Sequence, residues 1–258
     1  MQAKSSDRIR QLVVALGAIV AIVGAAWGSG AFGGTPIEQA AGGALAPDAT
    51  LLGAATPAFR IWSVIYSGLL AFAVVQALPS RAAASRYRAA SWWILVSMVL
   101  NFAWIAVVQA GWLWLSVVVL LAIVAVLVVT ASRLAAEREG RWLDRAVTDV
   151  TVGIYLGWAL VASAANIAAA IDLSSTALAI VIVAVVVAVA MALLTQFRSR
   201  PIGVGMTLAA AWGLTWIGVA RLDEPHNDAV ALAAYVAAAL AIAAAAWRAG
   251  RPSSSSRP

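Results

Sequence analysis

Long apolar runs separated by short polar or turn-forming segments dominate the pattern along the chain. Each run is near twenty residues long and rich in Ala, Leu and Val, enough to cross roughly 30 Å of hydrocarbon at about 1.5 Å per helical residue. The runs are continuous and lack the alternation of membrane β-barrels, which favours helices over strands. We predict eight spans, over residues 12–29, 59–78, 91–109, 112–131, 150–171, 176–197, 202–220 and 229–247.

The composition supports a bilayer as the main solvent and partner of this chain. Of its 258 residues, 64% are hydrophobic and 11% are charged, and the mean hydropathy is +0.94. Soluble domains carry roughly a quarter charged residues. The charged side chains of this chain are too few to cover an apolar core of this size. The predicted fold class is all-α, a polytopic helix bundle of the cell membrane.

Basic residues occupy alternate loops, which predicts the orientation by the positive-inside rule. With both termini inside, only Arg60 and Arg221 of the 17 basic residues lie outside. The inner ones are Lys4, Arg8, Arg10, Arg81, Arg86, Arg88, Arg133, Arg138, Arg141, Arg145, Arg198, Arg200, Arg248, Arg251 and Arg257. Their spread through short loops, rather than along one face, disfavours a nucleic-acid partner.

The ends of the chain leave two further expectations. Lys4, Arg8 and Arg10 before an apolar run also fit a cleaved signal peptide, but cleavage would invert the charge bias of all later loops. A retained first helix is therefore preferred. Residues 30–56, rich in Gly, Ala and Pro, form the one long loop, and residues 249–258 are expected to be disordered.

Several chemistries are excluded by residue counts. The chain has no cysteine and a single histidine, and Lys4 is its only lysine, which removes disulfides, thiolate metal sites, a P-loop lysine and a His-rich metal cluster. We predict neither a metal site nor catalytic residues. Charged residues are also missing from the middle of every span, which argues against an ion-coupled pump or transporter.

The twelve tryptophans divide by depth. Seven lie at span ends, where amphipathic rings anchor at the membrane interface. These are Trp27, Trp92, Trp93, Trp112, Trp114, Trp142 and Trp247. Five lie within spans and need another explanation: Trp62, Trp104, Trp158, Trp212 and Trp216.

The span over 150–171 has two distinct faces. At about 100° per residue, one polar and aromatic stripe contains Tyr155, Trp158, Ala162 and Asn166. The opposite side carries small residues suited to close helix contact, namely Gly153, Gly157, Ala164 and Ala168. This helix therefore has a lining face and a packing face.

Two other spans carry similar groups at a similar depth. Trp62 and Tyr66 lie one turn apart in the second span, as do Asn101 and Trp104 in the third. Aromatic faces and polar tips converging from three spans predict a pocket for a flat apolar ligand. The alternative is that the rings fill space and the asparagines join neighbouring helices by hydrogen bonds.

These residues resemble the motifs of the TspO/MBR family, the tryptophan-rich sensory or translocator proteins. The matching elements are Pro57-x-Phe59-x-x-Trp62-x-x-x-Tyr66, Leu100-Asn101-x-x-Trp104 and Tyr155-x-x-Trp158-x-x-x-Ala162-x-x-x-Asn166. The resemblance covers residues 10–171 and implies a five-helix bundle, often homodimeric, that binds porphyrin, haem or other flat hydrophobic ligands without a required cofactor. It implies a pocket open toward the long loop, lined or braced by Trp62, Tyr66, Asn101, Trp104, Tyr155, Trp158 and Asn166.

The chain departs from the family pattern in two places. Ala54-Ala55-Thr56-Pro57 replaces the usual Trp-x-Pro-Pro element. Three further spans follow the five-helix part, so we predict a division into residues 1–171, a transmembrane extension over 172–248 and the tail. Within that extension, Trp212 and Trp216 either pack against the bundle or extend the pocket, and packing is favoured.

The favoured function is a receptor or sensor that binds tetrapyrroles or other flat apolar molecules. The alternative is a passive transporter of small hydrophobic molecules through the bundle. Enzymatic breakdown of a bound pigment is a third hypothesis, but no nucleophile has an evident base, so we do not expect an enzyme. Arg60 either meets a ligand carboxylate or extends to the lipid headgroups.

Overall fold

The computed structural model describes residues 3–30, 33–137, 140–197, 199–223 and 225–250, which form helices and no β-strand. Eight segments within these ranges are long and apolar enough to cross a membrane, which confirms the all-α polytopic fold. They are α1 (Ser5–Gly28), the 3₁₀ turn η2 (Thr56–Arg60) with α3 (Ile61–Ala77), α4 (Ser85–Gln109), α5 (Leu113–Ala136), α6 (Trp142–Ala170), α7 (Thr176–Gln196), α8 (Arg200–Ala220) and α9 (Asp228–Gly250).

Several helices extend beyond the predicted spans at one end, because charged residues there continue the helix. α1 begins at Ser5 rather than at residue 12, where the Asp7 carboxylate accepts a hydrogen bond of 2.9 Å from the backbone N–H of Lys4. α6 begins at Trp142 rather than at residue 150, and Asp144 caps it in the same way. A search for apolar runs alone does not detect polar first turns of this kind.

Ion pairs hold these charged helix ends together. Asp7 of α1 pairs with Arg88 of α4 at 2.5 Å, and Arg86 of α4 pairs with Asp149 of α6. The Ser199 hydroxyl, just before α8, donates to the same Asp149 carboxylate at 2.7 Å. Asp149 thus joins α4, α6 and the start of α8, so polar contacts connect both halves of the chain at this end.

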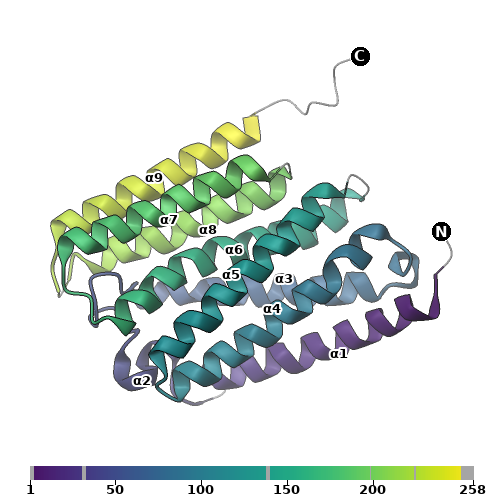
Figure 1. The fold of residues 1–258 in the computed structure, drawn as a ribbon, viewed down its shortest axis with the longest axis horizontal. Helices are drawn as coiled ribbons and strands as arrows, with labels where there is room; N and C mark the ends of the chain where they lie inside the picture. Colours follow the sequence, from purple (N-terminus) through teal and green to yellow (C-terminus); the bar gives the residue numbers. More distant parts are fainter. Residues whose placement is uncertain (1–2, 31–32, 138–139, 198, 224, 251–258) are drawn as a thin grey trace.

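α6 is the central helix of the bundle and the most buried of the spans. It lies between α1, α3, α4 and α5 on one side and α7, α8 and α9 on the other (Figure 1). Its most extensive contact is with α8, where Gly153 and Gly157 face the backbone of Ile202 and Met206. The predicted packing face of α6 is therefore a close contact with α8.

α1 begins and α9 ends at the same end of the bundle, as an even number of spans requires (Figure 1). The opposite end, here called the long-loop end, carries the segment between α1 and α3 with the 3₁₀ turn η1 (Ile37–Gln39) and the short helix α2 (Ala40–Gly43). Which side of the membrane each end faces stays a prediction. Residues 251–258 of the predicted disordered tail lie outside the described residues.

Candidate ligand-binding site

α3, α4 and α6 bring all seven predicted site residues together beneath the long loop. Trp62 of α3 is the centre of an aromatic cluster, with ring centroids 5.4 Å from Tyr66, 6.1 Å from Trp104, 5.9 Å from Tyr155 and 6.1 Å from Trp158. Trp104 is 2% exposed and Trp158 is 3% exposed. The aromatic rings that the residue spacing placed on three separate spans therefore do lie together in the structure.

Hydrogen bonds fix the polar tips of this aromatic cluster. The Asn101 amide donates to the Tyr66 hydroxyl at 3.0 Å, and the Trp104 indole N–H donates to the Asn166 side-chain carbonyl at 3.1 Å. The Tyr155 hydroxyl donates to the backbone carbonyl of Ser97 at 3.2 Å. Both asparagines thus join helices, as the alternative interpretation of these residues expected, while also belonging to the cluster.

A small cavity of about 30 Å³ lies against this cluster. Trp104, Trp158 and Asn166 line it, whereas Trp62, Tyr66, Asn101 and Tyr155 lie outside its lining. The remaining lining residues are Leu45, Ala54, Phe59, Val161, Ala162, Ala165 and Ile217. Since ligand pockets have roughly 300–1,000 Å³ and a water needs about 10–15 Å³, this volume suits one or two waters. A porphyrin-sized ligand requires the cavity to open.

Two of these lining residues, Leu45 and Ala54, come from the long loop and a third, Phe59, from η2, and together they cover part of the cavity as a lid. We define the lid as residues 44–60. Phe59 of the lid meets the edge of Trp158 with ring centroids 6.0 Å apart. The motif match includes Phe59, but Leu45 and Ala54 have no periodic pattern that marks them, so the sequence did not predict them.

α8 holds the lid in place through several hydrogen bonds. The Ala55 N–H donates to the Trp216 carbonyl at 3.1 Å, and the Trp212 indole N–H donates to the Ala58 carbonyl at 2.9 Å. Neither of these two rings lines the cavity. They pack against η2 and each other, which is the favoured interpretation from the sequence.

Arg221, directly after α8, attaches the lid at two points. Its side chain is fully buried and donates to the carbonyls of Pro47 and Thr50. Burial lowers the pKa of its guanidinium, and the nearby Asp48 carboxylate opposes that shift. An arginine stays charged under these conditions, so its donors remain available to the lid carbonyls.

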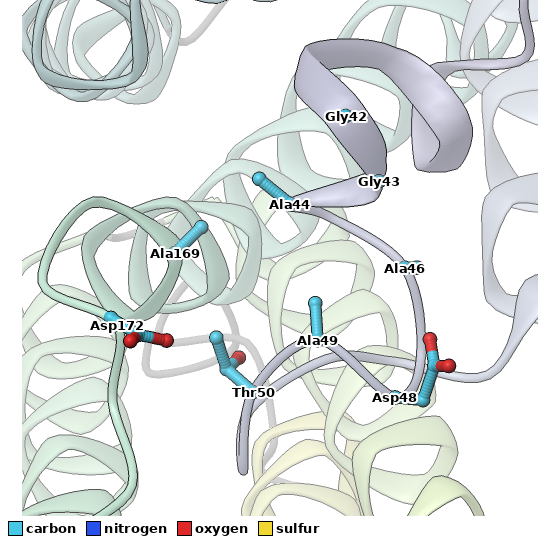
Figure 2. Close-up of a pocket in the computed structure, with 9 residues that line it drawn as sticks. All are labelled: Gly42, Gly43, Ala44, Ala46, Asp48, Ala49, Thr50, Ala169 and Asp172. Atoms are coloured by element: carbon cyan, nitrogen blue, oxygen red, sulfur yellow. The ribbon is translucent and has the colours of Figure 1, made fainter.

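A larger open hollow of about 440 Å³ lies at the long-loop end (Figure 2). Its walls are residues 42–44, 46 and 48–50 of the loop, with Ala169 of α6 and Asp172 just after that helix. Ala169 lies one turn beyond Ala165 of the small cavity, and Ala44 is next to Leu45. The hollow and the cavity therefore lie about one helical turn apart along α6.

Two buried polar atoms in the aromatic cluster have no protein partner. They are the indole nitrogen of Trp158 and the side-chain oxygen of Asn101. A buried donor without a partner costs on the order of 1–3 kcal/mol, so it favours an incoming acceptor. Among the described residues no group of three His, Asp or Glu side chains is arranged to hold a metal ion.

Membrane-spanning helices, an internal tryptophan-lined cavity and a long loop beside it define a class of polytopic membrane protein with a cavity inside the bundle. The family model described as TSPO-like protein matches residues 11–247. The chain therefore belongs to the TSPO-like protein family. The match continues through α7, α8 and α9, past residue 171, where the sequence-based resemblance ended. No curated protein and no solved structure matches the chain.

Proposed function

We propose that this protein is a membrane receptor or sensor that binds tetrapyrroles, such as porphyrin or haem, or other flat hydrophobic molecules. The ligand would occupy the cavity between α4, α6, α8 and the lid, and the aromatic cluster would lie beside it. The observation that carries the proposal is the buried Trp158 indole, which lines the cavity and has an unused N–H donor. No cofactor is required, because the tetrapyrrole is the ligand itself.

Binding in this site requires the lid to move. The cavity has only about 30 Å³, and Leu45, Ala54 and Phe59 of the lid form part of its wall. Moving Leu45 and Ala54, which belong to the same loop segment as the lining of the hollow, would enlarge the cavity toward the long-loop end. The ligand would then enter from the long-loop end, where the hollow is open.

Passive transport through the bundle receives less support from the packing. Beyond the aromatic cluster, Phe72 packs against Tyr87 with ring centroids 6.2 Å apart, and Arg86 pairs with Asp149. These side chains fill the bundle on the way to its charged end. We therefore propose binding rather than passage, and uptake of porphyrin into proteoliposomes would contradict this choice.

Quenching of tryptophan fluorescence by porphyrin tests the site. We expect saturable quenching in the wild type, with the midpoint shifted about tenfold to higher concentration in a Trp104→Phe, Trp158→Phe double variant, which corresponds to about 1.4 kcal/mol. Trp142→Phe is the control, because this ring is 78% exposed at the start of α6. Equal midpoints in the wild type and the double variant would remove the proposed site.

A further inference from the structure

Arg60 is a charged residue near the long-loop end of the membrane-spanning segment formed by η2 and α3. It ends η2 and is exposed, and no hydrogen bond or ion pair to it is found among the described residues. The Trp212 indole N–H donates to the carbonyl of Ala58, which precedes Arg60 by two residues. Trp212 itself lies eight residues before Ala220, where α8 ends. At about 1.5 Å per residue, the backbone beside Trp212 is about 12 Å from the long-loop end of α8. Charged residues within membrane-spanning segments usually face a partner or serve a function.

Arg60 lines an apolar groove of about 270 Å³ on the outside of the bundle. The groove runs between α3, α6 and α8, and its other lining residues are Ile61, Val64, Ile154, Leu208, Ala209 and Trp212. Val64 is 55% exposed and Leu208 is 48% exposed, so the groove faces the lipid. Because α3 runs away from the long-loop end, Arg60 lies at the end of the groove nearer the headgroups, and the apolar residues continue toward the membrane centre.

The charge of Arg60 and the apolar shape of the groove together indicate which kind of molecule binds there. An acyl chain fits an apolar channel inside the hydrocarbon, and a guanidinium binds phosphate oxygens through paired N–H donors. The arginine stem can extend along apolar surface while its head reaches the headgroup level. The Trp212 indole N–H is already used by Ala58, so Arg60 is the available donor at this end of the groove.

We propose that the groove between α3, α6 and α8 is a binding site for an anionic phospholipid. One acyl chain lies along Val64, Ile154 and Leu208, and the lipid phosphate accepts hydrogen bonds from the Arg60 guanidinium. This site is separate from the cavity, since the two share no lining residue. It uses α8, so it depends on the helices beyond the predicted five-helix part.

Native mass spectrometry of the full chain tests the role of the charge. The purified protein is titrated with phosphatidylglycerol and, separately, with phosphatidylcholine. We expect Arg60→Gln to weaken binding of the first phosphatidylglycerol about tenfold and to leave phosphatidylcholine binding unchanged. Arg8→Gln is the matched control, because Arg8 is also exposed but lies at the charged end of α1. Equal losses in both variants, or no loss in Arg60→Gln, would overturn the proposal.

Filling the groove tests the position of the acyl chain. Val64→Trp places a large ring in the groove, and we expect it to displace the phosphatidylglycerol that Arg60 holds. Val74→Trp is the control on the same helix, since Val74 is 58% exposed and outside the groove. The thermal midpoint of each variant checks its folding. A folded Val64→Trp variant that binds phosphatidylglycerol as the wild type does would contradict the assigned groove. Neither experiment uses porphyrin, so the outcome is independent of the proposed function.

Discussion

At the scale of single residues, Asn166 joins three helices at the cavity. Its side-chain carbonyl accepts hydrogen bonds from Trp104 of α4 at 3.1 Å and from Ser116 of α5 at 3.0 Å. Its amide donates to the Ala162 carbonyl in α6 at 2.9 Å. Because no water is available in hydrocarbon to replace these partners, Asn166 has a structural role besides lining the cavity.

Replacing Asn166 therefore affects stability even without a ligand. We expect Asn166→Leu to lower the free energy of unfolding by about 1–2 kcal/mol, since the buried Trp104 N–H loses its acceptor. Unfolding by titration with a denaturing detergent measures this change. Asn101→Leu is the comparison, because Asn101 makes one side-chain hydrogen bond and its oxygen has no partner. If Asn101→Leu lowers the free energy of unfolding as much as Asn166→Leu does, the special role of Asn166 is contradicted.

At the scale of elements, the contact between α6 and α8 depends on missing side chains. A Cβ atom at Gly157 would lie 2.0 Å from the Met206 carbonyl oxygen, and one at Gly153 would lie 2.4 Å from that of Ile202. Both neighbours are backbone atoms, which cannot rotate away as a side chain can. The two helices therefore approach closely only because these positions are glycines.

Gly157→Ala should push α6 and α8 apart. We expect the free energy of unfolding to fall by about 1–3 kcal/mol, the usual effect of overpacking, as measured by thermal or detergent unfolding. Gly203→Ala in α8 is the control, because its Cβ would meet the flexible end of Leu194 at 2.7 Å. If Gly203→Ala destabilises the protein more, the close backbone contact is not the controlling feature.

The two faces of α6 show what helical periodicity can and cannot predict. Residues spaced three and four apart must share a face, so the stripe with Trp158 and the small-residue face with Gly157 are both visible in the sequence. The partner of each face depends on contacts far apart in the chain. The sequence therefore predicts that Gly157 packs closely, but not that Met206 of α8 is what it meets.

At the scale of the whole molecule, the bilayer makes the number of spans predictable. Every backbone polar group in hydrocarbon must be satisfied within a helix, so each apolar run of sufficient length becomes one. The lid follows no such rule. Leu45 and Ala54 reach the cavity because α8 and Arg221 hold the loop there, and no local pattern encodes those attachments. The predicted division at residue 171 stays a prediction.

Arg221 is expected to control access to the cavity. The chain contains no cysteine, so Ala54→Cys introduces a single thiol on the cavity wall, at a position 7% exposed. We expect maleimide to label it slowly, and about tenfold faster when Arg221→Met is added, because the Pro47 and Thr50 carbonyls lose their donors. The labelling rate in detergent micelles measures this change.

A second thiol separates lid opening from general unfolding. Ala168→Cys lies in α6 at a position that is fully buried and outside the cavity lining. Its labelling should stay slow when Arg221→Met is added. Equal acceleration at both positions would mean that Arg221 stabilises the whole fold and does not specifically hold the lid.

The attachments between lid and α8 also set a thermodynamic threshold for ligand capture. Breaking the bonds from Ala55, Trp212 and Arg221 together costs about 3 kcal/mol, if each group contributes about 1 kcal/mol. The open state would then be populated at roughly one part in a hundred, and the apparent dissociation constant would be about a hundredfold weaker than that of the open site. Selectivity would follow, since only molecules whose intrinsic affinity exceeds this threshold would be retained at low concentration.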